Sequence, residues 1–72
     1  MQEIVFVVEQ EEDGSFVAEA HISDNEQIIT EGNSIEELKL MIKDALECHY
    51  DNIEDMPKTV RLHFVKEEVF EI

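Results

Sequence analysis

Three histidines and one cysteine are the side chains in this sequence best suited to chemistry near neutral pH. His21, His49 and His63 could share a metal ion with a carboxylate, but no two of them have ligand spacing within one predicted element. Cys48 precedes His49, and adjacent residues of a helix point about 100° apart, so the two side chains cannot face each other as thiolate and base. We therefore predict no catalytic residue, no metal site and no cofactor, and an inert, half-buried thiol at Cys48.

Two of the histidines support an alternative hypothesis. His49 falls near the apolar stripe of a predicted helix, where a histidine is more often packed than catalytic. His63 alternates with Leu62 and Phe64 along a predicted strand, which places it on the opposite face of the sheet. The alternative to a non-catalytic domain is a small-molecule-binding or enzymatic domain that uses His49 or His63.

The charge of the chain is strongly acidic. Nineteen Asp and Glu residues stand against five Lys and Arg, for a net charge of -14. Carboxylates are so abundant that no single pair indicates acid–base catalysis, and such a surface repels both nucleic acid and anionic membranes. A basic protein would be attracted, mainly through faster association. The alternatives are that the acidity aids solubility or reflects a high-salt habitat.

The stretch from Gly32 to Tyr50 predicts the single helix of the chain. Ser34 and Glu37 have the spacing of a capping box, in which the Ser34 hydroxyl accepts from the Glu37 N–H and the Glu37 carboxylate accepts from the Ser34 N–H. Apolar side chains and one histidine follow at steps of three and four: Ile35, Leu38, Met41, Ile42, Ala45, Leu46 and His49. A second set predicts a solvent-facing side with ion pairs: Glu36, Lys39, Lys43 and Glu47.

Four segments with alternating or continuous apolar residues predict strands: 3–10, 15–22, 26–31 and 59–66. Asp13-Gly14 between two apolar segments predicts a hairpin turn, since both residues tolerate positive φ. A helix with one apolar stripe needs a sheet to cover. The order therefore predicts a single domain, 1–72, with a two-layer α+β fold, β-β-β-α-β, in which a mostly antiparallel sheet carries one helix on one face. No secretory or membrane-spanning pattern is visible, so we expect a cytoplasmic protein.

The two faces of the predicted sheet differ in the size of their side chains. The small residues Ala18 and Ala20 leave room for the helix, so the even-numbered face should be the covered one. Valines then gather on the other face, and an exposed apolar patch predicts self-association. We predict a homodimer or larger even-numbered oligomer with an interface at Val5, Val7, Val17, Val65, Val69 and Phe70. The alternative is that the C-terminal residues 69–72 fold back over the valines of their own chain.

The segment from Val5 to Leu46 carries a family resemblance. An acidic glycine hairpin (Glu12–Ser15) leads into the strand 16–20, and a third strand closes in Thr30-Glu31-Gly32 before the box Asn33-Ser34-Ile35-Glu36-Glu37-Leu38. This order resembles the HicB-like antitoxin family, in the short stand-alone form of UPF0150-type proteins. In that family the domain binds and occludes a small basic toxin that cleaves RNA. The resemblance implies a non-catalytic protein-binding module with such a toxin as its partner, or an orphan oligomeric relative.

The sequence departs from the family pattern in two places. The proline-rich link usual between the second and third strands is replaced by Ser23-Asp24-Asn25-Glu26. The sequence also ends shortly after the fourth predicted strand, without the DNA-binding segment of family members that repress their own operon. We therefore expect no direct contact with nucleic acid, and the toxin-contacting residues of the family cannot be carried over.

Overall fold

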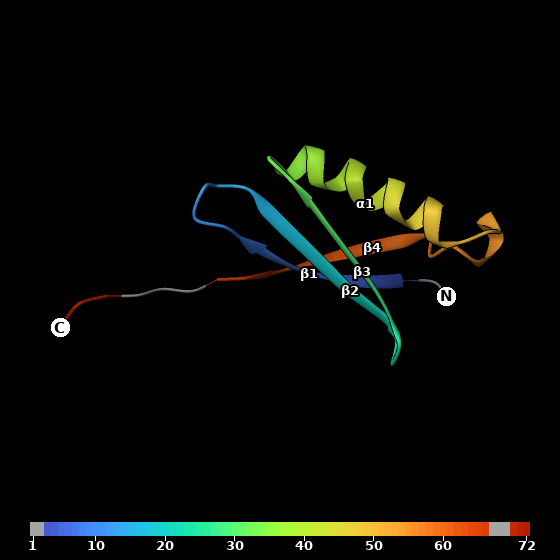
Figure 1. The fold of residues 1–72 in the computed structure, drawn as a ribbon, viewed down its shortest axis with the longest axis horizontal. Helices are drawn as coiled ribbons and strands as arrows, with labels where there is room; N and C mark the ends of the chain where they lie inside the picture. Colours follow the sequence, from blue (N-terminus) through green and yellow to red (C-terminus); the bar gives the residue numbers. More distant parts are fainter. Residues whose placement is uncertain (1–2, 67–69) are drawn as a thin grey trace.

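The computed structural model describes residues 3–66 and 70–72. Its elements are β1 (Glu3–Gln10), β2 (Phe16–Ser23), β3 (Glu26–Gly32), α1 (Ile35–His49), a short 3₁₀ helix (Ile53–Asp55) and β4 (Thr59–Val65). One layer is a four-stranded sheet, and α1 forms the second layer on one of its faces (Figure 1). This confirms the predicted α+β fold, and each strand lies within one residue of its predicted bounds.

The sheet is mixed, with the strand order β3-β2-β1-β4. β1 pairs with β2 and β2 pairs with β3 in antiparallel fashion, through two hairpins. β4 pairs in parallel with β1, with Phe6 beside Leu62 and Val8 beside Phe64. The chain therefore passes from one edge of the sheet to the other through α1, and β3 and β4 are the two edge strands.

The first hairpin turn lies where it was predicted, at Asp13-Gly14 between β1 and β2. Gly14 has a φ of 90°, whereas no residue other than glycine has a positive φ in the part of the chain that the structure describes. The Gly14 N–H donates to the Glu11 carbonyl over 3.0 Å, and the Glu11 N–H donates to the Ser15 carbonyl over 2.7 Å. Glycine alone supplies the left-handed conformation that a loop of this length requires.

The cap of α1 is formed largely as predicted. The Glu37 N–H donates to the Ser34 hydroxyl over 3.1 Å, which satisfies one of the free donors at the helix start. The Glu37 carboxylate, however, accepts from the N–H of Asn33 over 3.2 Å, one residue before the predicted donor. Both carboxylates of the first turn, Glu36 and Glu37, lie where the helix dipole favours negative charge.

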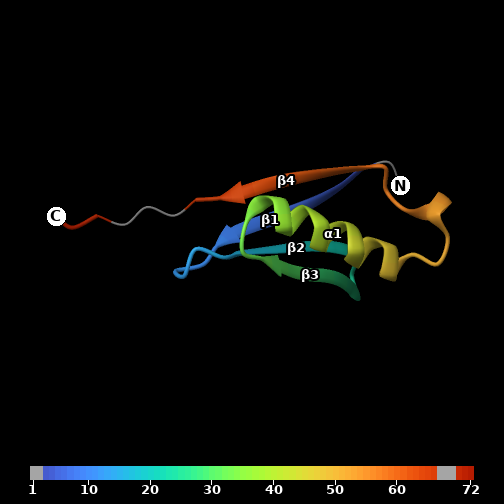
Figure 2. The ribbon, with the colours of Figure 1, turned by 90° about the horizontal axis from the view of Figure 1, so that it is seen from above.

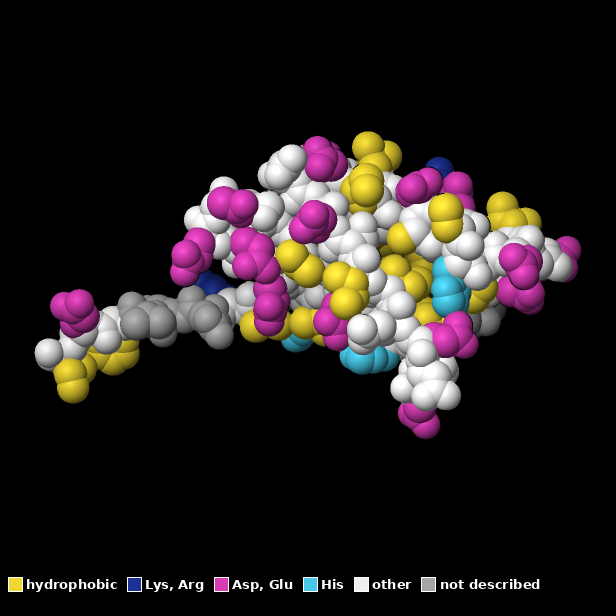
Figure 3. Space-filling model, in the orientation of Figure 1, with side chains coloured by type: hydrophobic (Ala, Val, Ile, Leu, Met, Phe, Trp, Pro, Cys, Tyr) yellow, Lys and Arg dark blue, Asp and Glu magenta, His cyan; other side chains and the backbone are white. Residues whose placement is uncertain are grey.

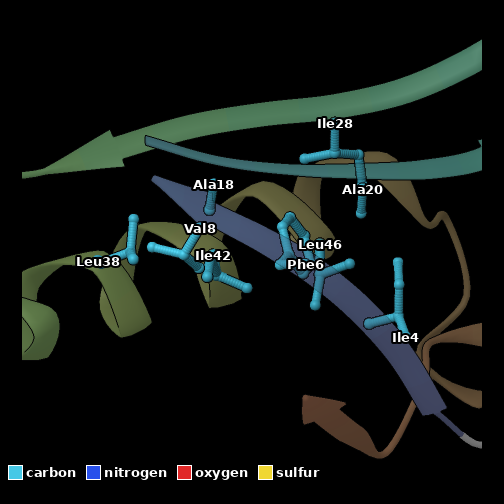
Figure 4. Packing of buried hydrophobic residues seen from close by; sticks show 9 residues of the cluster. All are labelled: Ile4, Phe6, Val8, Ala18, Ala20, Ile28, Leu38, Ile42 and Leu46. Carbon is cyan, nitrogen blue, oxygen red and sulfur yellow. The ribbon is translucent and has the colours of Figure 1, made fainter. Parts of the chain in front are cut away.

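The core lies between α1 and the even-numbered face of the sheet (Figure 4). Leu38, Ile42 and Leu46, each four residues apart, are the buried residues of the helix. They pack with six sheet residues: Ile4, Phe6, Val8, Ala18, Ala20 and Ile28. The two alanines are buried as predicted and let the helix approach β2 closely. Met41 was predicted on the apolar stripe, but it is exposed because the buried stripe follows steps of four only.

The helix does not cover the whole even-numbered face. α1 contacts β3 and β2, and β4 lies beside the strip that the helix covers (Figure 2). A helix with its side chains is about 10 Å wide and strands lie about 4.8 Å apart, so one helix cannot cover four strands. On the helix side of β4, Val60 is 37% exposed and Phe64 is 52% exposed. The expectation that the helix covers this face is therefore wrong for Val60 and Phe64, whereas Leu62 is partly buried and packs against the core.

Candidate functional site

The sheet face turned away from α1, here called the open face, carries the odd-numbered residues of the strands. Its apolar members are Val5, Val7, Val17, Ile29 and Val65, and its acidic members are Glu3, Glu9, Glu19 and Glu31. Val5 is 45% exposed and Val7 is 41% exposed, as expected for a face without a covering element. The open face holds four of the predicted interface residues: Val5, Val7, Val17 and Val65.

The strand register interleaves valines and carboxylates on the open face. One row across the sheet reads Glu31, Val17, Glu9, Val65, and the next reads Ile29, Glu19, Val7, His63. Each valine of these rows therefore has an acidic or imidazole side chain beside it in the hydrogen-bonding direction. The face combines apolar contact area with negative charge and is not a continuous valine patch.

Within the part of the chain that the structure describes, two of the open-face glutamates make an ion pair and two do not. Arg61 Nε donates to Glu3 Oε1 over 2.7 Å, which raises the pKa of Arg61, and His21 Nε2 lies 2.9 Å from Glu19 Oε1. Glu9 and Glu31 are exposed and make no ion pair with any residue in the ranges 3–66 and 70–72. The unpaired charge lies toward the end of the face where β1 and β2 join.

An open hollow of about 510 Å³ lies at this hairpin end, lined by Glu11, Glu12, Asp13, Ser15, Val17 and Glu31. Figure 3 shows carboxylates gathered over the same end of the molecule. Asp13 accepts from the Ser15 hydroxyl over 2.6 Å and from the Ser15 N–H over 2.9 Å. Both hydrogen bonds favour the ionised carboxylate and lower the pKa of Asp13, and the bond from the Ser15 hydroxyl has the larger effect. The hollow is thus suited to cationic side chains.

The histidines are not brought together. His49, at the end of α1, has its Nε2 3.2 Å from Glu26 Oε2, and its ring meets the Tyr50 ring edge-on at 4.9 Å between centroids. His63 lies on the open face beside Val7, on the other side of the sheet. No three His, Cys, Asp or Glu residues lie close enough to hold a metal ion in the part of the chain that the structure describes. Cys48 is exposed, so its predicted half-burial is wrong.

The two remaining predicted interface residues, Val69 and Phe70, belong to the C-terminal segment. Phe70 is 77% exposed, and Val69 lies outside the described residues.

The expected ion pairs among Glu36, Lys39, Lys43 and Glu47 are absent from the described residues. The two lysines instead line a groove between α1 and β4, which the helical spacing of the residues did not indicate. Lys39 and Lys43 directly follow the buried residues Leu38 and Ile42, and this adjacency is the sequence signal that could have placed them beside the sheet.

The fold and the open face define the class: a small acidic α+β domain with one face of its sheet left uncovered. No protein-family model matches the chain, and no solved structure matches it. A UPF0150 protein of Thermotoga maritima is 42% identical over 66 residues, which cover 92% of this chain and 87% of the relative. A UPF0150 protein of Archaeoglobus fulgidus is 44% identical over 48 residues, 67% of each chain.

The chain therefore belongs to the UPF0150 family. In the residues that the structure describes, α1 is neither long nor apolar enough to cross a membrane, and the same holds for the short 3₁₀ helix.

Proposed function

We propose that this chain is a non-catalytic protein-binding module, similar to the HicB-like antitoxin domain, that binds a small basic protein at the hairpin end of its open face. The observation that supports this proposal most directly is the hollow beside Val17, where carboxylates of the turn meet the unpaired Glu31. The membership of the UPF0150 family is compatible with such a module.

The chemistry of the open face favours a basic partner over a neutral one. A net charge of -14 steers a cationic protein toward the surface and speeds its association. The exposed Val5 and Val7, with the partly buried Val17, then supply apolar area that loses water on contact. A partner whose cationic surface normally binds RNA would be blocked, because the carboxylates would occupy the place of the phosphates. The resemblance to antitoxins suggests an RNA-cleaving toxin as this partner.

The same face is less suited to a second copy of the chain. In a two-fold symmetric contact, each patch meets its own copy, so Glu9 and Glu31 would approach further glutamates. Like charges placed together in an interface cost free energy. Self-association through Val5, Val7, Val17 and Val65 stays a prediction.

The test is co-purification with matched charge-reversal variants. The tagged chain is expected to retain a small basic protein from its native cells and to inhibit that protein's ribonuclease activity in a purified assay. Glu12→Lys together with Glu31→Lys reverses two charges at the hollow, and the complex should weaken roughly a hundredfold or more. Raising the salt concentration should slow association of the unaltered pair.

The control variant is Asp44→Lys with Glu47→Lys. Both residues are exposed on α1, away from the open face, and the change in net charge is identical. This variant should keep the partner. Equal loss in both double variants would mean that only total charge matters, and a captured protein that is acidic or has no ribonuclease activity would contradict the proposal.

A further inference from the structure

A second surface lies on the other side of the sheet, where β4 extends beyond α1. Here a groove of about 370 Å³ runs between the helix and the strand. Its apolar wall consists of Ile42, Leu46, Met56, Pro57, Val60 and Leu62. The groove exists because the buried helix side chains pack with residues of β1, β2 and β3, while Val60 and Phe64 of β4 stay exposed.

The edge of the groove concentrates the positive charge of the chain. Lys39, Lys43 and Lys58 line it, and the whole chain has five Lys and Arg residues. None of the three makes an ion pair or a hydrogen bond with another residue in the described ranges. An apolar groove edged by free ammonium groups fits an occupant that combines apolar and acidic side chains.

The C-terminal residues of the chain have this composition. Phe70-Glu71-Ile72 alternates apolar and acidic residues, and both apolar side chains are exposed. The described C-terminal residues lie beyond the far end of β4, whereas the groove lies at the start of that strand, at Val60 and Leu62 (Figure 1). In one chain, the C-terminal residues and the groove therefore lie toward opposite ends of β4.

We propose that residues 70–72 of one copy bind in the α1–β4 groove of a second copy. Phe70 and Ile72 contact the apolar wall, and Glu71 pairs with the lysines at the edge. A two-fold axis makes the exchange reciprocal, so two copies form a closed dimer. The contact leaves the open face free, and it does not depend on the basic partner proposed above.

The direct test is NMR on an equimolar mixture of isotope-labelled and unlabelled full-length chain. Filtered spectra should show contacts between the Phe70 ring of one copy and the Val60 and Leu62 methyl groups of the other. The Phe70→Ala variant should lose these contacts and raise the dimer dissociation constant roughly tenfold or more. Phe70 is 77% exposed, so this substitution leaves the core of the monomer intact.

A charge-matched pair of variants tests the lysines by sedimentation equilibrium. Lys43→Gln and Gln27→Glu each lower the net charge by one, but Gln27 is an exposed residue of β3, away from the groove. Lys43→Gln should weaken the dimer several-fold more than Gln27→Glu does. Val7→Asp, on the open face, should leave the dimer unchanged even if it abolishes binding of a basic partner.

Three results would overturn the inference. Contacts between Phe70 and the groove within a single chain would show that the segment folds back on its own copy. A dimer unaffected by Phe70→Ala would place the interface elsewhere. A small acidic molecule that co-purifies in the groove, detected by native mass spectrometry and displaced by Lys43→Gln, would identify a different occupant.

Discussion

At the scale of single residues, Gly32 lies at a position where a Cβ atom has no room. It ends β3 where the chain turns into α1, and a Cβ atom there would lie 2.7 Å from the Leu38 nitrogen and 2.9 Å from the Leu38 Cα. Backbone atoms of a helix cannot move aside as a flexible side chain can. We expect Gly32→Ala to lower the free energy of unfolding by about 1–3 kcal/mol, measured by urea denaturation.

Gly14 supplies the control for this prediction. A Cβ atom at Gly14 meets no atom within 4 Å, but the φ of 90° disfavours any L side chain. Gly14→Ala should cost about 1 kcal/mol through backbone strain alone. Gly14→Asn should cost less, since asparagine tolerates positive φ better than alanine. If Gly32→Ala proved as mild as Gly14→Asn, the close approach of β3 and α1 would not exist in solution.

Asp13 makes the stability of the hairpin turn depend on pH. Its two hydrogen bonds from Ser15 favour the ionised carboxylate, so its pKa is lower in the folded chain than in the unfolded chain. A lowered folded pKa stabilises the fold above the unfolded pKa, and that contribution disappears as the pH falls through the folded pKa. An NMR titration should place the Asp13 midpoint below that of an unstructured aspartate. Ser15→Ala should raise it, and an unchanged midpoint would argue against the hydroxyl contact.

At the scale of elements, the start of α1 depends on one hydroxyl. Ser34 accepts the Glu37 N–H, and alanine would leave that donor without its partner. We expect Ser34→Ala to reduce the free energy of unfolding by about 1 kcal/mol. Ser34→Asp keeps an acceptor at the same position and should retain most of the stability. A denaturation midpoint that is the same for the alanine variant and the unaltered chain would place the helix start elsewhere.

The elements themselves could be predicted because their signals are local. Capping residues, the steps of four among Leu38, Ile42 and Leu46, and the two alanines of β2 each depend on neighbours along the chain. Positions on the open face could also be predicted, since alternation alone assigns Val5 and Val7 to one side. These local signals predicted the fold class and the placement of Val5, Val7, Val17 and Val65 on one face of the sheet.

What could not be predicted depends on contacts between distant segments. Alternation shows that Val60 and Leu62 share a face, but it does not show that β4 pairs with β1 at an edge beyond the helix. The groove follows from that pairing. The interleaving of Glu9 and Val17 likewise follows from strand register, which periodicity leaves undetermined. Lys43 was predicted to face solvent in an ion pair for the same reason: its neighbours across the groove belong to another element.

At the scale of the whole molecule, charge is distributed unevenly between two surfaces. The hairpin end of the open face is acidic, while three of the five Lys and Arg residues line the groove on the opposite side. Each surface therefore attracts a different occupant. A basic protein fits the first, and the acidic, apolar C-terminal residues of a second copy fit the second. One copy can use both surfaces at once because the sheet separates them.

Self-association through either surface can be tested by measuring the mass of the chain and of a few variants. At micromolar concentration, light scattering should give a mass above the 8.4 kDa of one chain, provided that salt screens the repulsion between copies of charge -14. At roughly physiological ionic strength the screening length is about 8 Å, short enough to allow contact. Glu36→Lys, on the exposed side of α1, should not change the mass. A mass of one chain throughout would refute self-association by either surface.

The variants Val7→Asp and Phe70→Ala then separate the two surfaces. A charge at Val7 would lie within the open face beside Glu19 and would dissociate an oligomer built on the valines. Phe70→Ala removes apolar area that the groove would cover and leaves the open face unaltered. Because Glu9 and Glu31 oppose pairing of two open faces, we expect Phe70→Ala to give the single-chain mass and Val7→Asp to keep the dimer. The reverse result would assign self-association to the open face, where a basic partner would have to compete with it.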